Sequence, residues 1–331
     1  MRRTLFSSAA ITVAFVASAA AQQPPARGVR ELTASLRDGD PAVRAQAACS
    51  LRELGDRAAE AIPALVALMD DATPLKADVC ETNRNWGGRD GDVTTPGQQA
   101  AAALVATGSR AFDPVAGALR GPVWFARRNA AWALGALRDP RGVPLLIDAL
   151  GDREAQVREQ AAWGLGALRD SRATAPLVAR LKDEDVRVRE QASWALGALR
   201  DPNGVPGLLD ALHDSATPVR RQAAWALGAI RDPRATDGLS AAFRDSDGAV
   251  REQAAWAAGA LRDRHAVAPL IPLLTDTEAG VRRQAAWALG ALGDARALEP
   301  LLSALKDSDA GVRRQAAWAV GVVSKQAPLN R

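Results

Sequence analysis

A tryptophan recurs every 31 residues through most of the chain, and this spacing constrains the fold more than any other feature of the sequence. The series consists of Trp132, Trp163, Trp194, Trp225, Trp256, Trp287 and Trp318. The residues around each tryptophan are nearly the same, as in the run VRRQAAWALGAI over Val219–Ile230. A fixed period of this length is typical of a repeat array, in which one small unit is stacked many times.

Each unit is expected to contain two helices. Apolar residues recur at helical spacing over 219–230, and a second such stretch follows Asp232-Pro233 and runs to Phe243. Asp can cap the free amides of a helix, and Pro suits its first position, so Asp-Pro marks the start of the first helix of a unit. Three prolines fall inside that helix in one register, so we expect it to be kinked or to begin late. They are Pro176, Pro269 and Pro300.

Earlier units are recognisable without their tryptophan. Cys49 and Ala102 occupy the tryptophan position, and the step of 53 residues from one to the other indicates one unit of 31 residues with an insertion at about 72–95. Because a 31-residue unit cannot bury its apolar faces alone, its neighbours must supply the core. We therefore predict an all-α fold, an α-α superhelix of about nine helix pairs, over residues 29–324. A short tail, 325–331, follows it.

Residues 1–21 have the pattern of a signal peptide, with Arg2 and Arg3 before an apolar run and small residues before Gln22. We expect an exported protein, periplasmic or extracellular, with a short linker at 22–28. No later segment is apolar over about 18 residues, so no membrane span is expected in the mature chain. Removal of the leader leaves 40 basic and 38 acidic residues, a balance that gives no electrostatic case for a nucleic-acid partner.

The chain has two cysteines, Cys49 and Cys80. In an oxidising compartment a disulfide is their expected state. This bond would fold the insertion, which also contains Trp86, over the N-terminal end of the array. Because Cys49 takes the tryptophan position, we expect it to face the same surface as the tryptophans.

The pattern Val-Arg-x-x-Ala-Ala-Trp-Ala-Leu-Gly-Ala-Leu-x-Asp, its 31-residue step and the Leu-Leu-x-Ala-Leu endings resemble the phycobilisome (PBS) lyase HEAT-like repeats. Artificial alpha-repeat proteins built on that unit show the same resemblance. It is strong over Val123–Val323 and weaker over Val29–Leu119. The resemblance implies an α-solenoid, a right-handed superhelix whose second helices line a concave binding surface. It implies no particular activity, because this fold carries many functions.

The tryptophan is predicted to point away from the core of its own helix. On a helical wheel with Val219 at 0° and 100° per residue, four apolar residues fall within about 80° of Val219, namely Ala223, Ala226, Leu227 and Ile230. Trp225 falls near 240°. The resemblance implies that this is the concave face. An amide precedes each tryptophan by three residues and a charge by four, close enough to cover the indole.

The candidate partner-binding residues are the seven tryptophans, the amides Gln160, Gln191, Gln222, Gln253, Gln284 and Gln315, and the arginines Arg221, Arg283 and Arg314. Two interpretations of the tryptophans stay open. They anchor a partner, since exposed apolar patches are usually binding sites, or they wedge between units and stiffen the array.

A second arginine series lies at the edge of the predicted core. Its members are Arg127, Arg158, Arg189, Arg220, Arg251, Arg282 and Arg313. We expect these side chains to bond loop aspartates of adjacent units, because guanidinium and carboxylate groups match in bidentate pairs.

Patterns of catalysis are missing from the sequence. His213 and His265 are 52 residues apart, without a ligand partner at suitable spacing, so neither a metal nor a cofactor is predicted. We expect no enzyme, but a scaffold that binds a protein or peptide along its tryptophan face. The alternatives are a glycan or cell-wall binder, in which indoles stack on sugars, and a bilin-lyase-like enzyme or enzyme partner.

Overall fold

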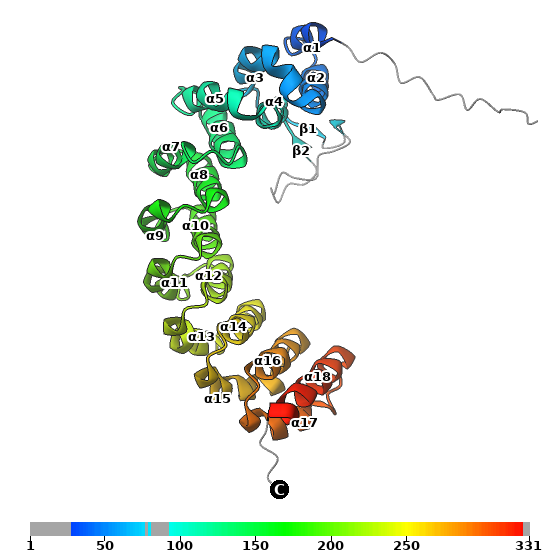
Figure 1. Ribbon diagram of the computed structural model, residues 1–331, viewed down its shortest axis with the longest axis vertical. Coiled ribbons are helices and arrows are strands. Elements are labelled where there is room, and N and C mark those ends of the chain that lie inside the picture. The colour runs from blue at the N-terminus through cyan, green and yellow to red at the C-terminus, as the bar shows by residue number, and fades with distance from the viewer. Residues whose placement is uncertain (1–27, 77–78, 81–92, 327–331) are drawn as a thin grey trace, which may run out of the picture.

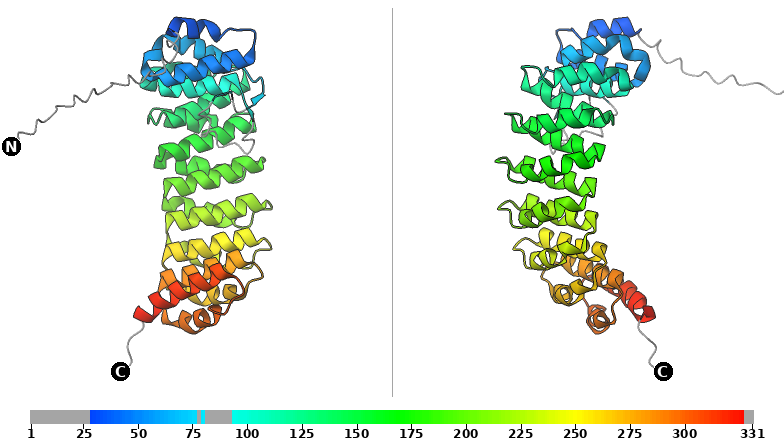
Figure 2. Two further views of the ribbon diagram at one scale, coloured as in Figure 1. Left: turned by 90° about the vertical axis from the view of Figure 1, so that its right-hand side faces the viewer. Right: turned by 60° about the vertical axis from the view of Figure 1, so that its left-hand side comes forward.

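The computed structural model describes residues 28–76, 79–80 and 93–326. The expected signal peptide and Trp86 lie outside the described residues. Eighteen α-helices in the described residues form nine pairs stacked in an arc, so the predicted α-α superhelix is confirmed. Figure 1 shows the second helix of each pair along the inner, concave side of the arc and the first helix along the outer side. Figure 2 shows the second helices stacked like rungs.

The helix bounds follow the predicted two-helix unit. The first helices are α1 (Val29–Ser35), α3 (Ile62–Leu68), α5 (Phe112–Ala118), α7 (Gly142–Ala149), α9 (Thr174–Arg180), α11 (Val205–Ala211), α13 (Thr236–Ala242), α15 (Val267–Leu270) and α17 (Leu298–Ala304). The second helices are α2 (Pro41–Leu54), α4 (Pro96–Ala106), α6 (Trp124–Ala136), α8 (Ala155–Leu168), α10 (Val186–Leu199), α12 (Thr217–Ile230), α14 (Gly248–Leu261), α16 (Ala279–Leu292) and α18 (Ala310–Gln326).

The first helices begin late, as their prolines predict. In the unit of α13, Asp232 accepts a hydrogen bond from the backbone N–H of Arg234 and caps a 3-10 turn, Pro233–Ala235, that precedes the α-helix. Pro176 is the third residue of α9, where its missing N–H costs no bond within the helix. An aspartate cap followed by a 3-10 turn also precedes α11, α15 and α17.

The core consists of small and branched apolar side chains between stacked helices. Val219, Ala223, Ala226 and Leu227 of α12 are fully buried, as predicted, but Ile230 is only partly buried. Ala224 and Gly228 of the same helix are buried as well. The buried side of α12 is therefore wider than the pattern of this helix alone suggests, because α12 packs against its own first helix, α11, and against the second helices α10 and α14.

The insertion contributes a small antiparallel sheet. Strand β1 (Leu75–Lys76) pairs with β2 (Val93–Thr94), and the pair lies on the inner side of the arc beside α2 and α4. A disulfide joins Cys49 to Cys80, with their Cα atoms 6.2 Å apart, so the predicted bond is confirmed. Within the described residues, no helix is both long and apolar enough to cross a membrane.

Candidate binding surface

The tryptophans of the series lean from one second helix onto the preceding one. A Cβ atom built on Gly197 of α10 would lie 2.6 Å from Cζ3 of Trp225 and 2.8 Å from Cα of Ala226 in α12. Only a glycine admits the indole and the neighbouring helix at this distance. The same contact joins Gly135 to Trp163, Gly166 to Trp194, Gly228 to Trp256, Gly259 to Trp287 and Gly290 to Trp318.

These indoles are only partly buried. Trp132, Trp163, Trp194, Trp225, Trp256 and Trp287 fall in the intermediate range between buried and exposed. Trp318 is 46% exposed, since no further helix pair covers it among the described residues. The rings of Trp132 and Trp163 stack with their centroids 6.1 Å apart. The tryptophans thus pack between units and still present part of their surface to solvent.

A row of amides accompanies the tryptophans. The side chains of Gln160, Gln191, Gln222, Gln253, Gln284 and Gln315 are all partly exposed. None of the six makes a side-chain hydrogen bond to another described residue. Each side-chain amide therefore has its donors and its acceptor available to a partner.

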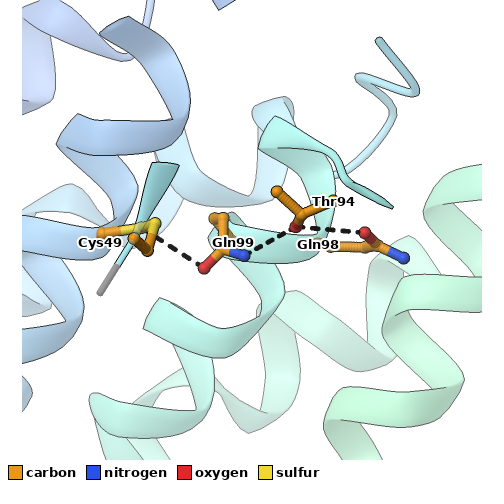
Figure 3. Close-up of a disulfide and its surroundings, with 5 residues drawn as sticks. Cys49, Thr94, Gln98 and Gln99 are labelled. Carbon is orange, nitrogen blue, oxygen red and sulfur yellow. Dashed lines mark hydrogen bonds between the residues drawn. A yellow bond between two sulfur atoms is a disulfide. The ribbon is translucent and has the colours of Figure 1, made fainter. Parts of the chain in front are cut away.

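The same register is used differently at the N-terminal end of the array, which the sequence did not reveal. Gln99, three residues before Ala102, is fully buried and donates to Oγ1 of Thr94 on β2 at 2.8 Å. Its Oε1 lies 3.4 Å from Sγ of Cys49 (Figure 3). Asn129, three residues before Trp132, is also buried and donates to the carbonyl of Met69, while its Oδ1 has no hydrogen-bond partner among the described residues. Among the units that carry a tryptophan, the accessible amides therefore begin at Gln160.

Cys49 lies on the second helix α2, at the tryptophan position of its unit, but its side chain is not open to solvent there. Its side chain is 3% exposed and Cys80 is 4% exposed, because the bonded pair lies against α4 and the strand β2. The strands β1 and β2 of the insertion lie on the same inner side of the arc as the second helices.

Three of the charges that precede the tryptophans do not cover the indoles. Arg221, Arg283 and Arg314 are exposed, and none stacks on an indole of the described residues, so the expectation is wrong for these three. Arg283 instead pairs with Glu252 of the preceding unit at 3.5 Å. Nearer the N-terminus, burial raises the pKa of Glu159 despite the nearby arginines, and burial lowers the pKa of Arg128.

The second arginine series forms clamps between units, as predicted. Arg220 donates from Nε and Nη2 to both carboxylate oxygens of Asp245, at 2.7 and 2.9 Å, and from Nη1 to the carbonyls of Asp214 and Ser215. The carboxylate of Asp245 also accepts the backbone N–H of Asp247. Equivalent clamps join Arg127 to Asp152, Arg158 to Asp183, Arg189 to Asp214, Arg251 to Asp276 and Arg282 to Asp307. Arg313 bonds only the carbonyls of Asp307 and Ser308 within the described residues.

The described residues include both histidines and two shallow cavities. No group of three or more His, Cys, Asp or Glu among them could hold a metal ion. His265 is exposed and contacts Asp263, the cap of its own turn, and His213 is exposed beside the carbonyl of Leu209. Two shallow cavities, of about 390 and 360 Å³, lie at the clamps of Arg158 and Arg282 and not along the tryptophans.

Stacked helix pairs joined by identical clamps define an α-solenoid repeat protein. The HEAT repeats family matches residues 97–166, 112–196, 143–228, 174–250 and 236–321, and the PBS lyase HEAT-like repeat matches residues 43–71. The chain belongs to the HEAT repeat family, and one unit, residues 43–71, also matches the PBS lyase HEAT-like repeat that the sequence resembles. No curated protein matches it significantly.

Several solved structures are similar to this chain. Kap95 bound to RanGDP is 16% identical, with a TM-score of 0.66 over 89% of this chain and 47% of Kap95. The Escherichia coli protein YibA is 19% identical, with a TM-score of 0.59 over 87% of this chain and 98% of YibA. The CpcE–CpcF complex of the Nostoc phycocyanin lyase is 24% identical, with a TM-score of 0.44 over 65% of this chain and 94% of that one. At these identities the likeness concerns the fold alone.

Proposed function

We propose that this chain is an exported, non-catalytic scaffold that binds an extended segment of a protein along the inner face of its arc. The amide row, Gln160 to Gln315, is the observation that carries the proposal. Six partly exposed amides, one per unit, have no hydrogen-bond partner among the described residues. An amide can donate to a peptide carbonyl and accept from a peptide N–H, so a regular row suits an extended main chain.

The tryptophans supply the apolar part of this surface. Each leaves part of its indole exposed beside an amide of the same helix, at a spacing of three residues. Sugar stacking has less support, because the indole rings lie against neighbouring helices and the rings of Trp132 and Trp163 stack on each other. A bilin-lyase-like activity with a cysteine nucleophile also has less support, because Cys49 and Cys80 are bonded and buried.

The test is a binding experiment that leaves the core untouched. The variant Gln191→Ala/Gln222→Ala/Gln253→Ala removes three amides without disturbing any described hydrogen bond. The control, Asp148→Ala/Asp210→Ala, changes exposed residues of α7 and α11 on the outer side. Wild type should capture a protein from envelope extract, the control should retain it, and the amide variant should lose it with unchanged helicity and melting temperature.

Other outcomes contradict the proposal. Undiminished capture by the amide variant would show that this face is not the binding surface. Binding to peptidoglycan or to a glycan array in place of protein would favour the sugar hypothesis. Covalent attachment of a bilin to a substrate protein would establish an enzyme.

A further inference from the structure

Most second helices end in a residue with left-handed backbone conformation. Glycine takes the corresponding position after α2, α4 and α16, as Gly55 (φ 57°, with ψ −131° outside the left-handed helical region), Gly108 (φ 73°) and Gly293 (φ 62°). Five consecutive units between them have arginine instead. These are Arg138, Arg169, Arg200, Arg231 and Arg262, with φ between 54° and 61°. We call the five residues the arginine edge.

The backbone alone does not account for arginine here. Arg231 and Gly293 make the same capping bond, from their N–H to the carbonyl of Leu227 or Leu289, so the conformation is the same in both units. An L-residue in this conformation costs about 1–2 kcal/mol, whereas glycine adopts it freely. A cation near a helix C-terminus is stabilised by the helix dipole, but that effect does not require a left-handed residue.

The arginine edge is free to bind. All five side chains are exposed, and none forms a hydrogen bond or ion pair with another described residue. The aspartate that follows each of them is already engaged. Asp232, for example, is bonded to Arg234, and Asp201 accepts from Thr174 and from the N–H of Asn203. No ion pair with another described residue offsets the charge of any edge arginine, so the edge carries one exposed positive charge per unit.

The spacing of these charges indicates what they fit. Stacked helices lie about 8–10 Å apart, so neighbouring guanidinium groups repeat at about that distance. A polypeptide in polyproline II conformation advances about 9 Å per turn of three residues. Carboxylates at every third residue would thus meet successive arginines, each as a bidentate pair.

We propose that the arginine edge binds an extended acidic polypeptide segment with a carboxylate at every third residue. It is a second binding surface, separate from the amide row. A nucleic acid fits less well, because its charges follow each other about every 3.4 Å along a strand and most of them would find no arginine.

The test uses two fluorescein-labelled 15-residue peptides and the full mature chain. One peptide is (Glu-Pro-Pro)5, and the other has the same composition with its five glutamates contiguous. Fluorescence anisotropy should show the spaced peptide binding about tenfold more tightly. Arg169→Gly/Arg200→Gly/Arg231→Gly should raise its Kd about tenfold, since three exposed ion pairs of this kind together account for about that change. The same variant should unfold at an equal or higher urea concentration, because glycine relieves the left-handed backbone.

A charge-matched control separates this site from general electrostatics. Arg120→Gln/Arg187→Gln/Arg244→Gln removes three exposed arginines elsewhere and should leave the Kd within about twofold of wild type. The variant with three alanines in the amide row should bind the peptide like wild type, so the two proposals can fail separately. Equal binding of both peptides, equal loss in the control, a lower unfolding midpoint for the glycine variant, or tighter binding of a 15-nucleotide single-stranded DNA would overturn the proposal.

Discussion

At the scale of single residues, a glycine on one helix and a tryptophan on the next act together. The indole of Trp225 occupies the space that a side chain at Gly197 would need. At the equivalent position of α18, a Cβ on Gly321 would meet nothing within 4 Å. The two glycines therefore share a sequence context but differ in what a methyl group would do.

We predict opposite effects for the same substitution at these glycines. Gly197→Ala should lower the free energy of unfolding by about 1–2 kcal/mol, because overpacking outweighs the gain in helix propensity. Gly321→Ala should raise it by up to about 1 kcal/mol, since alanine is the better helix former and the space is open. Urea denaturation followed by circular dichroism measures both. A stabilising Gly197→Ala would contradict the packing described for the tryptophans.

At the scale of elements, the clamps hold neighbouring pairs in register. In the clamp of Arg220 and Asp245 the two side chains are 13% and 10% exposed. The guanidinium nitrogens Nε, Nη1 and Nη2 each donate to an oxygen. When the partner of such an enclosed charge is removed, the remaining charge lowers the free energy of unfolding strongly. Arg313 provides an internal comparison, because within the described residues it bonds carbonyls but no carboxylate.

Loss of the arginine of a clamp should therefore lower the free energy of unfolding more than loss of Arg313, which lacks a carboxylate partner among the described residues. Arg220→Ala should lower the free energy of unfolding by about 3 kcal/mol, because Asp245 remains without its cation. Arg313→Ala should cost less than about 1 kcal/mol, as only two carbonyl bonds are lost. A double-mutant cycle of Arg220→Ala with Asp245→Asn checks the coupling, and additive effects in it would show that the clamp contributes nothing.

The sequence predicted these elements well, because the period repeats every local signal many times. Asp-Pro caps, late first helices, clamps and the cysteine pair follow from residue chemistry in a known register. Three features could not be predicted. A helical wheel describes one helix, so it does not show that Trp225 contacts Gly197 of the neighbouring helix. The burial of Cys49 depends on the inserted strand. Arginine has no preference for the left-handed conformation, so its position in the sequence does not indicate it.

At the scale of the whole molecule, the clamps and caps make the array sensitive to acid. Burial alone would raise the pKa of Asp183, but the hydrogen bonds from Arg158 and from the N–H of Asp185 outweigh it and lower the pKa. The hydrogen bonds from Arg296 lower the pKa of Asp294 to about 2. Aspartates with lowered pKa recur in successive units, so their effects accumulate along the chain.

We therefore predict a steep loss of stability below about pH 4. An aspartate titrates near 3.9 in the unfolded chain, so a lowered folded pKa contributes stability that is complete above that value. It is lost as the pH falls through the folded pKa, toward about 2. The melting temperature should be nearly constant from pH 7 to pH 5 and fall between pH 4 and pH 2.5. Asp245→Asn should show a shallower fall, and a flat profile in wild type would refute the prediction.

The clamps also make the units interchangeable. Arg158 meets Asp183 as Arg189 meets Asp214, 25 residues ahead in each case. Excision of residues 184–214, one whole period, would place Asp183 before Ser215 and rejoin surfaces that already match. A gene encoding such a chain can thus lengthen or shorten its product by whole units without any new interface having to arise. Excision of half a period would instead bring together two helix surfaces that do not match.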